Sequence, residues 1–330
     1  MMKIVVTGAG AVLGQGIIKS LKSASLPIRI IALDPNALSA GLHWTDEARL
    51  IPMATDPDYV SRIEAILDEV RPDAVLVGTD VELALFAQKR AEWEARFNTH
   101  ILVSPANVIE IADDKFQTAQ FLEANGLSNP RSVRAEDSAA LEQLIESIGF
   151  PLIVKPRRGA RAVGVSKVHN RTELDEALRG RSDLVVQQMA GEDDQEYTAG
   201  VLFFDNEVQA SIVLRRDLRD GNTYRAYSGE FPEYEKYVHD LAHALKPYGP
   251  TNFQFRVDQH GVPRLFEINA RFSGTTPMRA LFGFNEVELC LRKLILGEDI
   301  APPTIRHGTV IRFLEEQFLD HSQIAAVGRP

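Results

Sequence analysis

The chain has 330 residues, of which 45% are hydrophobic and 25% are charged, and its net charge is -10. This length is too great for one ordinary hydrophobic core, so we expect two or three domains. An acidic chain is not drawn to a phosphate backbone, which excludes nucleic acid as an expected partner.

The cysteine content and the apolar runs bear on the compartment. Cys290 is the single cysteine, so no internal disulfide can form, and a reducing environment fits. No apolar run reaches the roughly 18 residues that a membrane span needs. We therefore expect a cytoplasmic protein with no membrane partner.

Strands and helices alternate in the first third of the chain. Short apolar runs predict strands at residues 3–7, 28–33, 74–77 and 101–103. Helical periodicity predicts a helix that ends at residue 21 and two more at residues 61–70 and 82–95. This alternation predicts a doubly wound parallel sheet, so the first third is an α/β, Rossmann-like module.

A glycine-rich turn joins the first predicted strand to its helix. Gly8 and Gly10 open it, but Gly14 comes one residue too late for the dinucleotide-binding spacing. One interpretation is an NAD site with Asp34 on a ribose, and hence an oxidoreductase. The other, which we favour, is a tight strand-to-helix turn that needs no ligand.

A second short polar segment follows the predicted strand at residues 74–77. It contains Thr79, Asp80 and Glu82, at a carboxyl end where open sheets bind ligands. Glu82 is therefore a candidate substrate contact. The alternative is that Thr79 or Asp80 caps a helix and Glu82 lies in its first turn.

A lysine inside an apolar run marks the middle of the chain. Lys155 lies in the predicted strand at residues 150–156, where a buried ammonium costs free energy unless it meets an anion. The basic, small-residue segment at residues 157–165 follows. Its backbone N–H groups and arginines can cradle phosphates, or it can be a hairpin with a solvated basic tip.

Two alternating strands near residue 260 contain the strongest chemical signal. If the strands at residues 252–258 and 265–271 pair, then Gln254, Glu267 and Asn269 come together. Their oxygens are the hard ligands that Mg²⁺ or Mn²⁺ prefers, and Arg271 on the same face can neutralise a phosphoryl group. The alternative is a hairpin with one solvated polar face.

Four motifs in order resemble the ATP-grasp superfamily: Asp114-Lys115, Val154-Lys155-Pro156, Glu196-Tyr197 and the segment 266–271. The chain is most similar to the synthetase subunit of carbamoyl-phosphate synthase and to small ligases such as that of the pyrrolysine pathway. The resemblance implies a Rossmann-like pre-ATP-grasp domain followed by a two-subdomain ATP-grasp fold. The implied boundaries are residues 1–112, 113–189 for the lid subdomain, and 190–330 for the subdomain with the metal site.

The resemblance also implies roles for individual residues. Those assigned to ATP are Lys115 and Lys155 on the phosphates, Arg157, Gly159 and Gly164 in the phosphate-covering loop, Gln187, Gln188 and Met189 around adenine, and Glu196 on the ribose. Those assigned to Mg²⁺ or Mn²⁺ are Gln254, Glu267 and Asn269. Arg271 faces the transferring phosphate, and with Lys155 it forms the catalytic pair.

The implied activity is an ATP-dependent ligation of a small carboxylate to an amine or thiol through an acyl phosphate, with release of ADP and phosphate. Arg215, Arg225 and Thr275 lie where relatives bind substrate. An arginine there can grip a carboxylate, or it can belong to a solvated strand paired with Asp217. Thr275 can face the reaction centre or simply precede a helix.

Two other functions stay open within this resemblance. The first is an enzyme that phosphorylates bicarbonate or carbamate, as carbamoyl-phosphate synthase does. The second is a nucleotide-binding sensor without catalysis. The resemblance is compatible with a homodimer, since relatives often dimerise.

Overall fold

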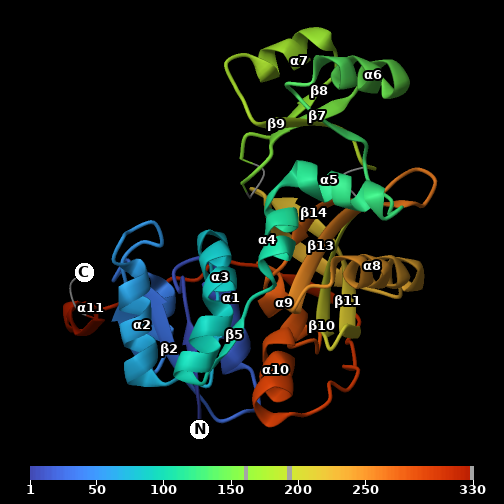
Figure 1. The fold of residues 1–330 in the computed structure, drawn as a ribbon. Coiled ribbons are helices and arrows are strands. Elements are labelled where there is room, and N and C mark those ends of the chain that lie inside the picture. Colours follow the sequence, from blue (N-terminus) through green and yellow to red (C-terminus); the bar gives the residue numbers. More distant parts are fainter. Residues whose placement is uncertain (160–162, 192–194, 328–330) are drawn as a thin grey trace.

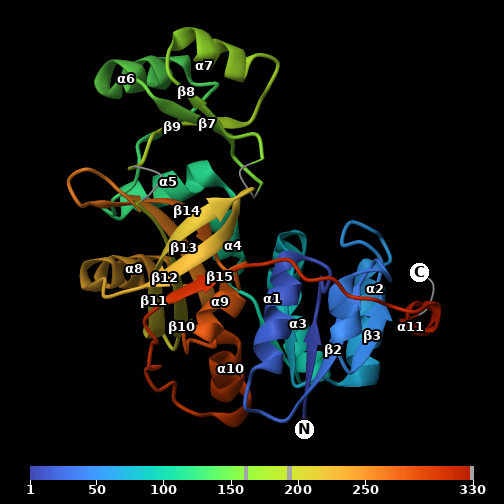
Figure 2. The same cartoon turned by 180° about the vertical axis from the view of Figure 1, so that it is seen from behind.

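The computed structural model describes residues 1–159, 163–191 and 195–327, which form three β-sheets with helices packed against them (Figures 1 and 2). The small four-stranded sheet stands apart at the top of Figure 1. The six-stranded sheet lies below it, beside the five-stranded sheet. The predicted mixed α/β class with a Rossmann-like first module is confirmed.

The first sheet is parallel, with strand order β3-β2-β1-β4-β5. Its strands are β1 (Met2–Val6), β2 (Ile28–Asp34), β3 (Glu47–Leu50), β4 (Ala74–Leu76) and β5 (His100–Leu102). Its helices are α1 (Val12–Lys22), α2 (Tyr59–Val70) and α3 (Asp80–Phe97), with a short 3₁₀ turn at Ala40–Trp44. The sequence patterns did not predict β3, because its Glu-Ala-Arg-Leu run is polar and forms a short edge strand.

The connections of this sheet reverse direction between β1 and β4. The chain leaves β1 through α1 toward β2, whereas it leaves β4 through α3 toward β5 on the other side. In open α/β sheets, the carboxyl edge at such a switch point is the usual ligand crevice.

The second sheet and its two helices lie within residues 113–189, the range expected for the lid subdomain, and are called the lid below. Its order is β6-β9-β7-β8, and two helices cover one side (Figure 1). The elements are β6 (Ser132–Arg134), α6 (Ser138–Ile148), β7 (Leu152–Pro156), β8 (Ser166–Val168), α7 (Arg171–Leu178) and β9 (Leu184–Gln188). Its hydrophobic cluster draws only on the lid itself, from Leu141 to Val186.

The third sheet is antiparallel, with order β14-β13-β10-β11-β12-β15. Its strands are β10 (Glu196–Phe204), β11 (Glu207–Arg219), β12 (Asn222–Ser228), β13 (Gly249–Val257), β14 (Pro263–Asn269) and β15 (Thr309–Ile311). The helices around it are α4 (Ala106–Asp113), α5 (Lys115–Ala124), α8 (Pro232–Leu245), α9 (Thr276–Leu281) and α10 (Glu286–Leu291). Helices α9 and α10 pack against α1, which joins this sheet to the first module.

Two hydrophobic clusters run through both large sheets. One contains Val5 of β1 together with Phe253 of β13. The other contains Ile4 of β1 together with Leu202 of β10. The first and third sheets therefore share a continuous core, and the lid does not take part in it.

The end of the chain returns to the first module. After β15 the chain crosses to the first sheet, where α11 (His321–Val327) lies against β3 (Figure 2). The indole Nε1 of Trp44 donates to Oε1 of Gln317 at 2.6 Å. This crossing adds a second covalent link between the two large sheets.

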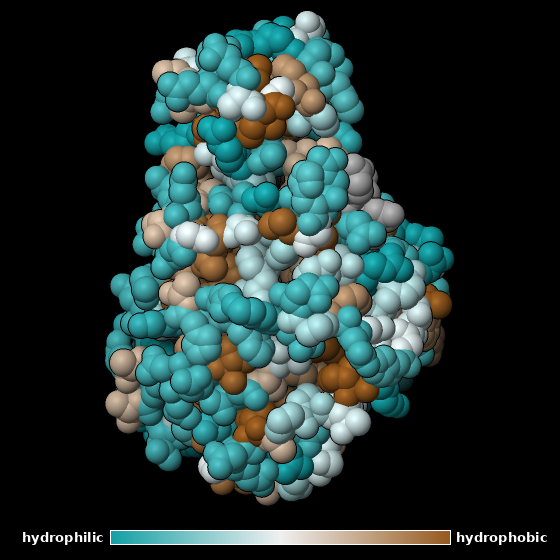
Figure 3. Space-filling view, turned by 90° about the vertical axis from the view of Figure 1, so that its right-hand side faces the viewer, coloured by the Kyte–Doolittle hydropathy of each residue, from teal (hydrophilic) through white to brown (hydrophobic). Residues whose placement is uncertain are grey.

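The face of the molecule shown in Figure 3 is mostly hydrophilic, and the apolar patches on it are small. In the part of the chain that the structure describes, no helix combines the length and apolarity that a membrane crossing needs.

Candidate nucleotide and metal site

Lys155 lies where the lid meets the third sheet. Its side chain extends from β7, is 5% exposed, and donates through Nζ to Oε1 of Gln187 at 2.7 Å and to the carbonyl of Phe266 at 3.4 Å. Burial, together with the charge of Lys115, lowers the pKa of Lys155 to about 7, while Glu267 opposes the shift. The site therefore holds a cation that lacks a full counter-charge.

This pKa predicts a pH dependence for nucleotide binding. Near pH 7 about half of the Lys155 side chains are neutral, and the phosphates of bound ATP favour the charged form. ATP binding should then take up protons, and its Kd should rise by up to about tenfold per pH unit above pH 7. Titration calorimetry in buffers of different ionisation enthalpy measures the uptake. Proton uptake that persists in Lys155→Met would show that another group is responsible.

Lys115 and the segment after β7 are tied together. Asp114 caps α5 by accepting from the backbone N–H groups of Phe116 and Gln117, and Arg157 donates to both of its oxygens. Lys115 Nζ donates to the carbonyl of Gly159 at 2.7 Å. Residues 160–162 of the expected phosphate-covering loop lie outside the described residues, whereas its first residues are held beside Lys115.

The residues expected around adenine end strand β9. Gln187 is engaged on both sides, since Oε1 accepts from Lys155 and Nε2 donates to Ser132 at 2.8 Å. The side chain of Gln188 accepts from the backbone N–H of Arg131 at 3.2 Å. Met189 follows the strand at the junction between the lid and the third sheet. In the paired strands β7 and β9, Gln187 lies opposite Ile153 and Gln188 opposite Leu152, and Gln187 contacts Lys155 through its side chain.

Glu196 has partners that the sequence analysis did not foresee. It is 3% exposed, and its two oxygens form ion pairs with Arg216 at 2.6 Å and with Arg256 at 2.7 Å. A ribose can reach this carboxylate only if one of these pairs opens. Arg216 faces Glu196 because β10 and β11 pair in register, with Tyr197 opposite Arg215. The sequence pattern indicated Arg215 as a candidate, but not Arg216, its neighbour on the opposite face of β11.

Strands β13 and β14 bring the expected metal ligands together. Their register pairs Gln254 with Glu267 and Asn252 with Asn269, as the alternation predicts. Asn269 donates through Nδ2 to Glu267 at 2.9 Å. The amide oxygens of Gln254 and Asn269 accept from Arg216 at 2.6 Å and from Arg271 at 2.7 Å.

The chemistry of this donor set fits a hard divalent cation. One carboxylate and two amide oxygens carry a single negative charge, and Mg²⁺ completes such a shell with water and phosphate oxygens. Both amide oxygens already accept hydrogen bonds from guanidinium groups, so these oxygens face positive charge and stabilise it. A bound cation would replace these donors.

Arg271 connects the third sheet to the first module. Its Nε donates to Oδ1 of Asp80 at 2.6 Å, and the side chain is 9% exposed. Asp80 begins α3 directly after β4, at the switch point of the first sheet. The candidate metal site and the ligand crevice of the first module are therefore adjacent.

The structure corrects the expectation for Glu82. Its carboxyl group is 3% exposed and accepts from the hydroxyls of Thr7 and Thr79 at 2.6 Å each, and from that of Tyr59. Burial raises the pKa of Glu82, against these hydrogen bonds. Both oxygens are occupied inside the module, so Glu82 is a structural residue and not a substrate contact.

The other expected substrate residues lie in two separate places. Arg215 and Arg225 lie 3.5 and 3.6 Å from Asp217 and stack over tyrosine rings, so the ion-paired alternative describes them. Thr275 is 3% exposed, and its hydroxyl shares a 2.7 Å hydrogen bond with Ser273. Each of the three thus has a partner within the described part of the chain.

The glycine-rich turn also has a structural explanation. The Asp34 carboxylate accepts from the backbone N–H of Gly10 at 2.7 Å and from the hydroxyl of Ser39 at 2.6 Å. A Cβ on Gly10 would lie 2.2 Å from Ser39 Oγ, and Gly8 has a φ of +57°. Asp34 therefore fixes a tight turn and is not available to a ribose, which removes the basis of the NAD interpretation.

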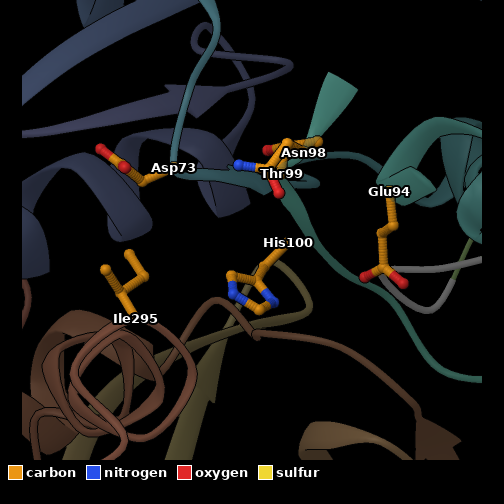
Figure 4. Close-up of a pocket in the computed structure, with 6 residues that line it drawn as sticks. All are labelled: Asp73, Glu94, Asn98, Thr99, His100 and Ile295. Atoms are coloured by element: carbon orange, nitrogen blue, oxygen red, sulfur yellow. The ribbon is translucent and has the colours of Figure 1, made fainter. Parts of the chain in front are cut away.

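A pocket of about 320 Å³ lies elsewhere (Figure 4). Its lining residues are Asp73, Glu94, Asn98, Thr99, His100 and Ile295. Asp73 and His100 stand at the amino ends of β4 and β5, so the pocket opens at the edge of the sheet opposite to the switch point. It is separate from the candidate site.

Comparisons with known families agree with this architecture. Residues 4–101 match the PylC-like N-terminal domain, and residues 112–238 match the RimK-like ATP-grasp domain. Residues 182–317 match the ATP-grasp of a biosynthetic pathway with the Ter operon. Two overlapping ATP-grasp models thus cover residues 112–317 of the chain. Its particular form joins a PylC-like first module to ATP-grasp domains that cover most of the remainder.

Curated relatives include carbamoyl phosphate synthase large chains. That of Sulfolobus acidocaldarius is 24% identical over 329 residues, which cover 90% of this chain and 30% of the relative. That of Thermomicrobium roseum is 25% identical over 339 residues, with 93% and 30% covered. The chain thus spans about a third of the length of these relatives.

Solved structures share the fold. N5-carboxyaminoimidazole synthetase from Staphylococcus aureus, complexed with ADP, has a TM-score of 0.73 at 15% identity, covering 92% of this chain and 80% of that one. The biotin carboxylase domain dimer of Hydrogenobacter thermophilus 2-oxoglutarate carboxylase, with MgADP and bicarbonate, gives 0.73 at 20%, covering 94% and 73%. L-amino acid ligase from Bacillus licheniformis gives 0.68 at 20%, covering 89% and 74%.

Proposed function

We propose that the chain is a Mg-ATP-dependent ligase that phosphorylates a small carboxylate and passes the acyl group to an amine. The observation that carries the proposal is the convergence of Lys155, the Gln254–Glu267–Asn269 oxygens and Arg271 where the lid meets the third sheet. The similarity to ATP-dependent synthetases, carboxylases and an amino acid ligase supports the same chemistry. A thiol acceptor would use the same first step.

Positioning and charge neutralisation perform this chemistry. Lys155 and Lys115 hold the phosphates of ATP. Gln254, Glu267 and Asn269 would hold Mg²⁺, which would supply positive charge to neutralise the phosphates. Arg271 stabilises the transferred phosphoryl group as it moves to the carboxylate oxygen. The segment that follows β7 covers the phosphates and keeps water from the acyl phosphate.

The test is ADP release from Mg-ATP with a panel of carboxylates, alone and with amines, and with hydroxylamine as a general trap for acyl phosphates. We expect ADP and a hydroxamate with particular carboxylates, and neither product above background in Glu267→Ala. Glu123→Ala, a change at an exposed position on α5, is the matched control. If ATP binds but no carboxylate gives ADP or hydroxamate, the sensor function replaces this proposal.

A second candidate is phosphorylation of bicarbonate or carbamate. It is favoured by the match of 90% of the chain to a carbamoyl phosphate synthase large chain and by the neutral Gln254 among the metal ligands. ADP release that depends on bicarbonate and on no organic carboxylate would select it.

A further inference from the structure

We propose that the acceptor substrate is a primary amine with an apolar body, bound at the switch point of the first sheet with its ammonium group on Asp80. The inference rests on the proposed ligase function and names the class of its second substrate. Three observations carry it. The Asp80 carboxylate has an oxygen that can accept a further hydrogen bond, exposed apolar side chains lie along the same edge of the sheet, and both adjoin Arg271 or the segment that follows it.

Asp80 offers a carboxylate oxygen at the right place. Its side chain is 46% exposed, and Oδ1 accepts from Arg271 Nε at 2.6 Å. Within residues 1–159, 163–191 and 195–327, no hydrogen bond to Oδ2 of Asp80 is present. Arg271 is held independently by the carbonyl of Phe272, which accepts from Nη1 at 2.9 Å. An ammonium group on Oδ2 would thus lie beside the arginine that stabilises the acyl phosphate.

Exposed apolar side chains follow the strands of the first sheet along the edge that contains Asp80. The segments that follow β4, β1, β2 and β3 contain Val81, Val12, Leu38 and Met53, with exposed fractions of 70%, 44%, 65% and 59%. Because the strands are parallel and adjacent, these segments all lie along one carboxyl edge of the sheet. Apolar side chains exposed along one edge of a sheet favour an apolar ligand.

The apolar row adjoins the segment after Arg271. A Cβ on Gly274 would lie 3.5 Å from Cγ1 of Val12, and a Cβ on Gly16 would lie 3.0 Å from Pro277. The segment that leads from Arg271 into α9 therefore packs on the first turns of α1. A molecule on Val12 and Val81 can place its amine at Asp80 without leaving the reaction centre.

The chemistry balances with Asp80 as proton acceptor. The bound ammonium transfers one proton to the Asp80 carboxylate, which frees the nitrogen lone pair. That pair attacks the carbonyl carbon of the acyl phosphate and forms the C–N bond. The C–O bond to phosphate breaks, and phosphate leaves with the electron pair and takes up the second proton that the nitrogen loses as the amide forms. Asp80 is a general base in this step, as carboxylates are elsewhere.

The experiment compares hydroxylamine, methylamine and n-butylamine as acceptors, with the carboxylate that supports ADP release. Hydroxylamine is largely unprotonated at neutral pH, so it needs neither an ammonium site nor a base. We expect kcat/KM to rise about fourfold for each methylene that becomes buried. Asp80→Asn should lower the ratio of kcat/KM for n-butylamine to kcat/KM for hydroxylamine at least tenfold. Val81→Ser should abolish the preference for n-butylamine over methylamine.

The outcomes separate this inference from the proposed function. Asp68→Asn, at an exposed carboxylate on α2, is the matched control and should change neither reaction. Failure of the wild type to form any hydroxamate defeats the ligase function itself. Hydroxamate formation with equal use of both amines, or with an unchanged Asp80→Asn, defeats the acceptor site alone. An equal loss of hydroxamate and amide in Asp80→Asn would show that Asp80 acts through Arg271, and would also overturn the inference.

Discussion

Replacement of Lys155 by methionine should reduce kcat/KM for ATP by about 10²–10³, the usual effect of deleting one preorganised cationic donor at a developing charge. Methionine keeps the length and apolar contacts of the buried side chain and removes the ammonium group. In the free protein the substitution also removes a poorly compensated buried cation, because burial lowers the pKa of Lys155 to about 7. We therefore expect the variant to fold at least as stably as the wild type.

The matched control is Lys167→Met. Lys167 lies on β8 opposite Ile153 of β7, and its side chain is exposed. It shares the lid sheet with Lys155 but not the interior of the site. Steady-state ADP release and the thermal midpoint of both variants decide the matter. A Lys155→Met protein with wild-type turnover would contradict the role of Lys155 in holding the phosphates.

Replacement of Arg279 by methionine should lower the free energy of unfolding by about 3–5 kcal/mol. Arg279 is fully buried between the third sheet and α10, where it lies 3.1 Å from both oxygens of Glu286 and also donates to Asn252 and Thr198. The variant leaves Glu286, which is 0% exposed, without its counter-charge. Urea unfolding monitored by circular dichroism measures the loss.

Two further variants test the cause of that loss. Arg171→Met removes an arginine that is 52% exposed and paired with Glu142 and Asp175, and it should cost less than about 1 kcal/mol. Adding Glu286→Leu to Arg279→Met should recover part of the lost stability, since an apolar pair tolerates burial better than a lone carboxylate. A double variant less stable than Arg279→Met would mean that Glu286 is stabilised without Arg279.

Local patterns predicted four of the five strands of the first sheet and the site strands β7, β13 and β14, because their signals are periodic or apolar. Polar and apolar residues alternate in the segments that contain Gln254 and Glu267, and this pattern predicted that the two residues come together. The register of β13 and β14 pairs them. Helix α5 begins at a local signal, since the carboxylate of Asp114 caps it. Strand β3 could not be predicted from its own sequence, because its residues become extended by pairing with β2 and not through their own strand propensity.

The buried arginines were the main omission in the predicted site. Arg216 meets Glu196 from 20 residues away, and Arg279 meets Thr198 from 81 residues away. Only the tertiary fold determines such partners, and an arginine in sequence is ordinarily expected at the surface. One signal was available for Arg279: Gly200 stands in an otherwise continuous strand, and a Cβ there would lie 2.7 Å from the guanidinium group.

The separation of hydrophobic clusters has a consequence for cooperativity. Because the first and third sheets share two clusters and are linked again by the terminal crossing to β3, they should unfold as one thermodynamic unit. The lid has its own cluster and forms a smaller foldon. Its displacement mainly breaks the polar contacts that Lys155 and Arg157 make outside the lid. We therefore expect that moving the lid to admit substrate or release product costs only a small fraction of the global free energy of unfolding.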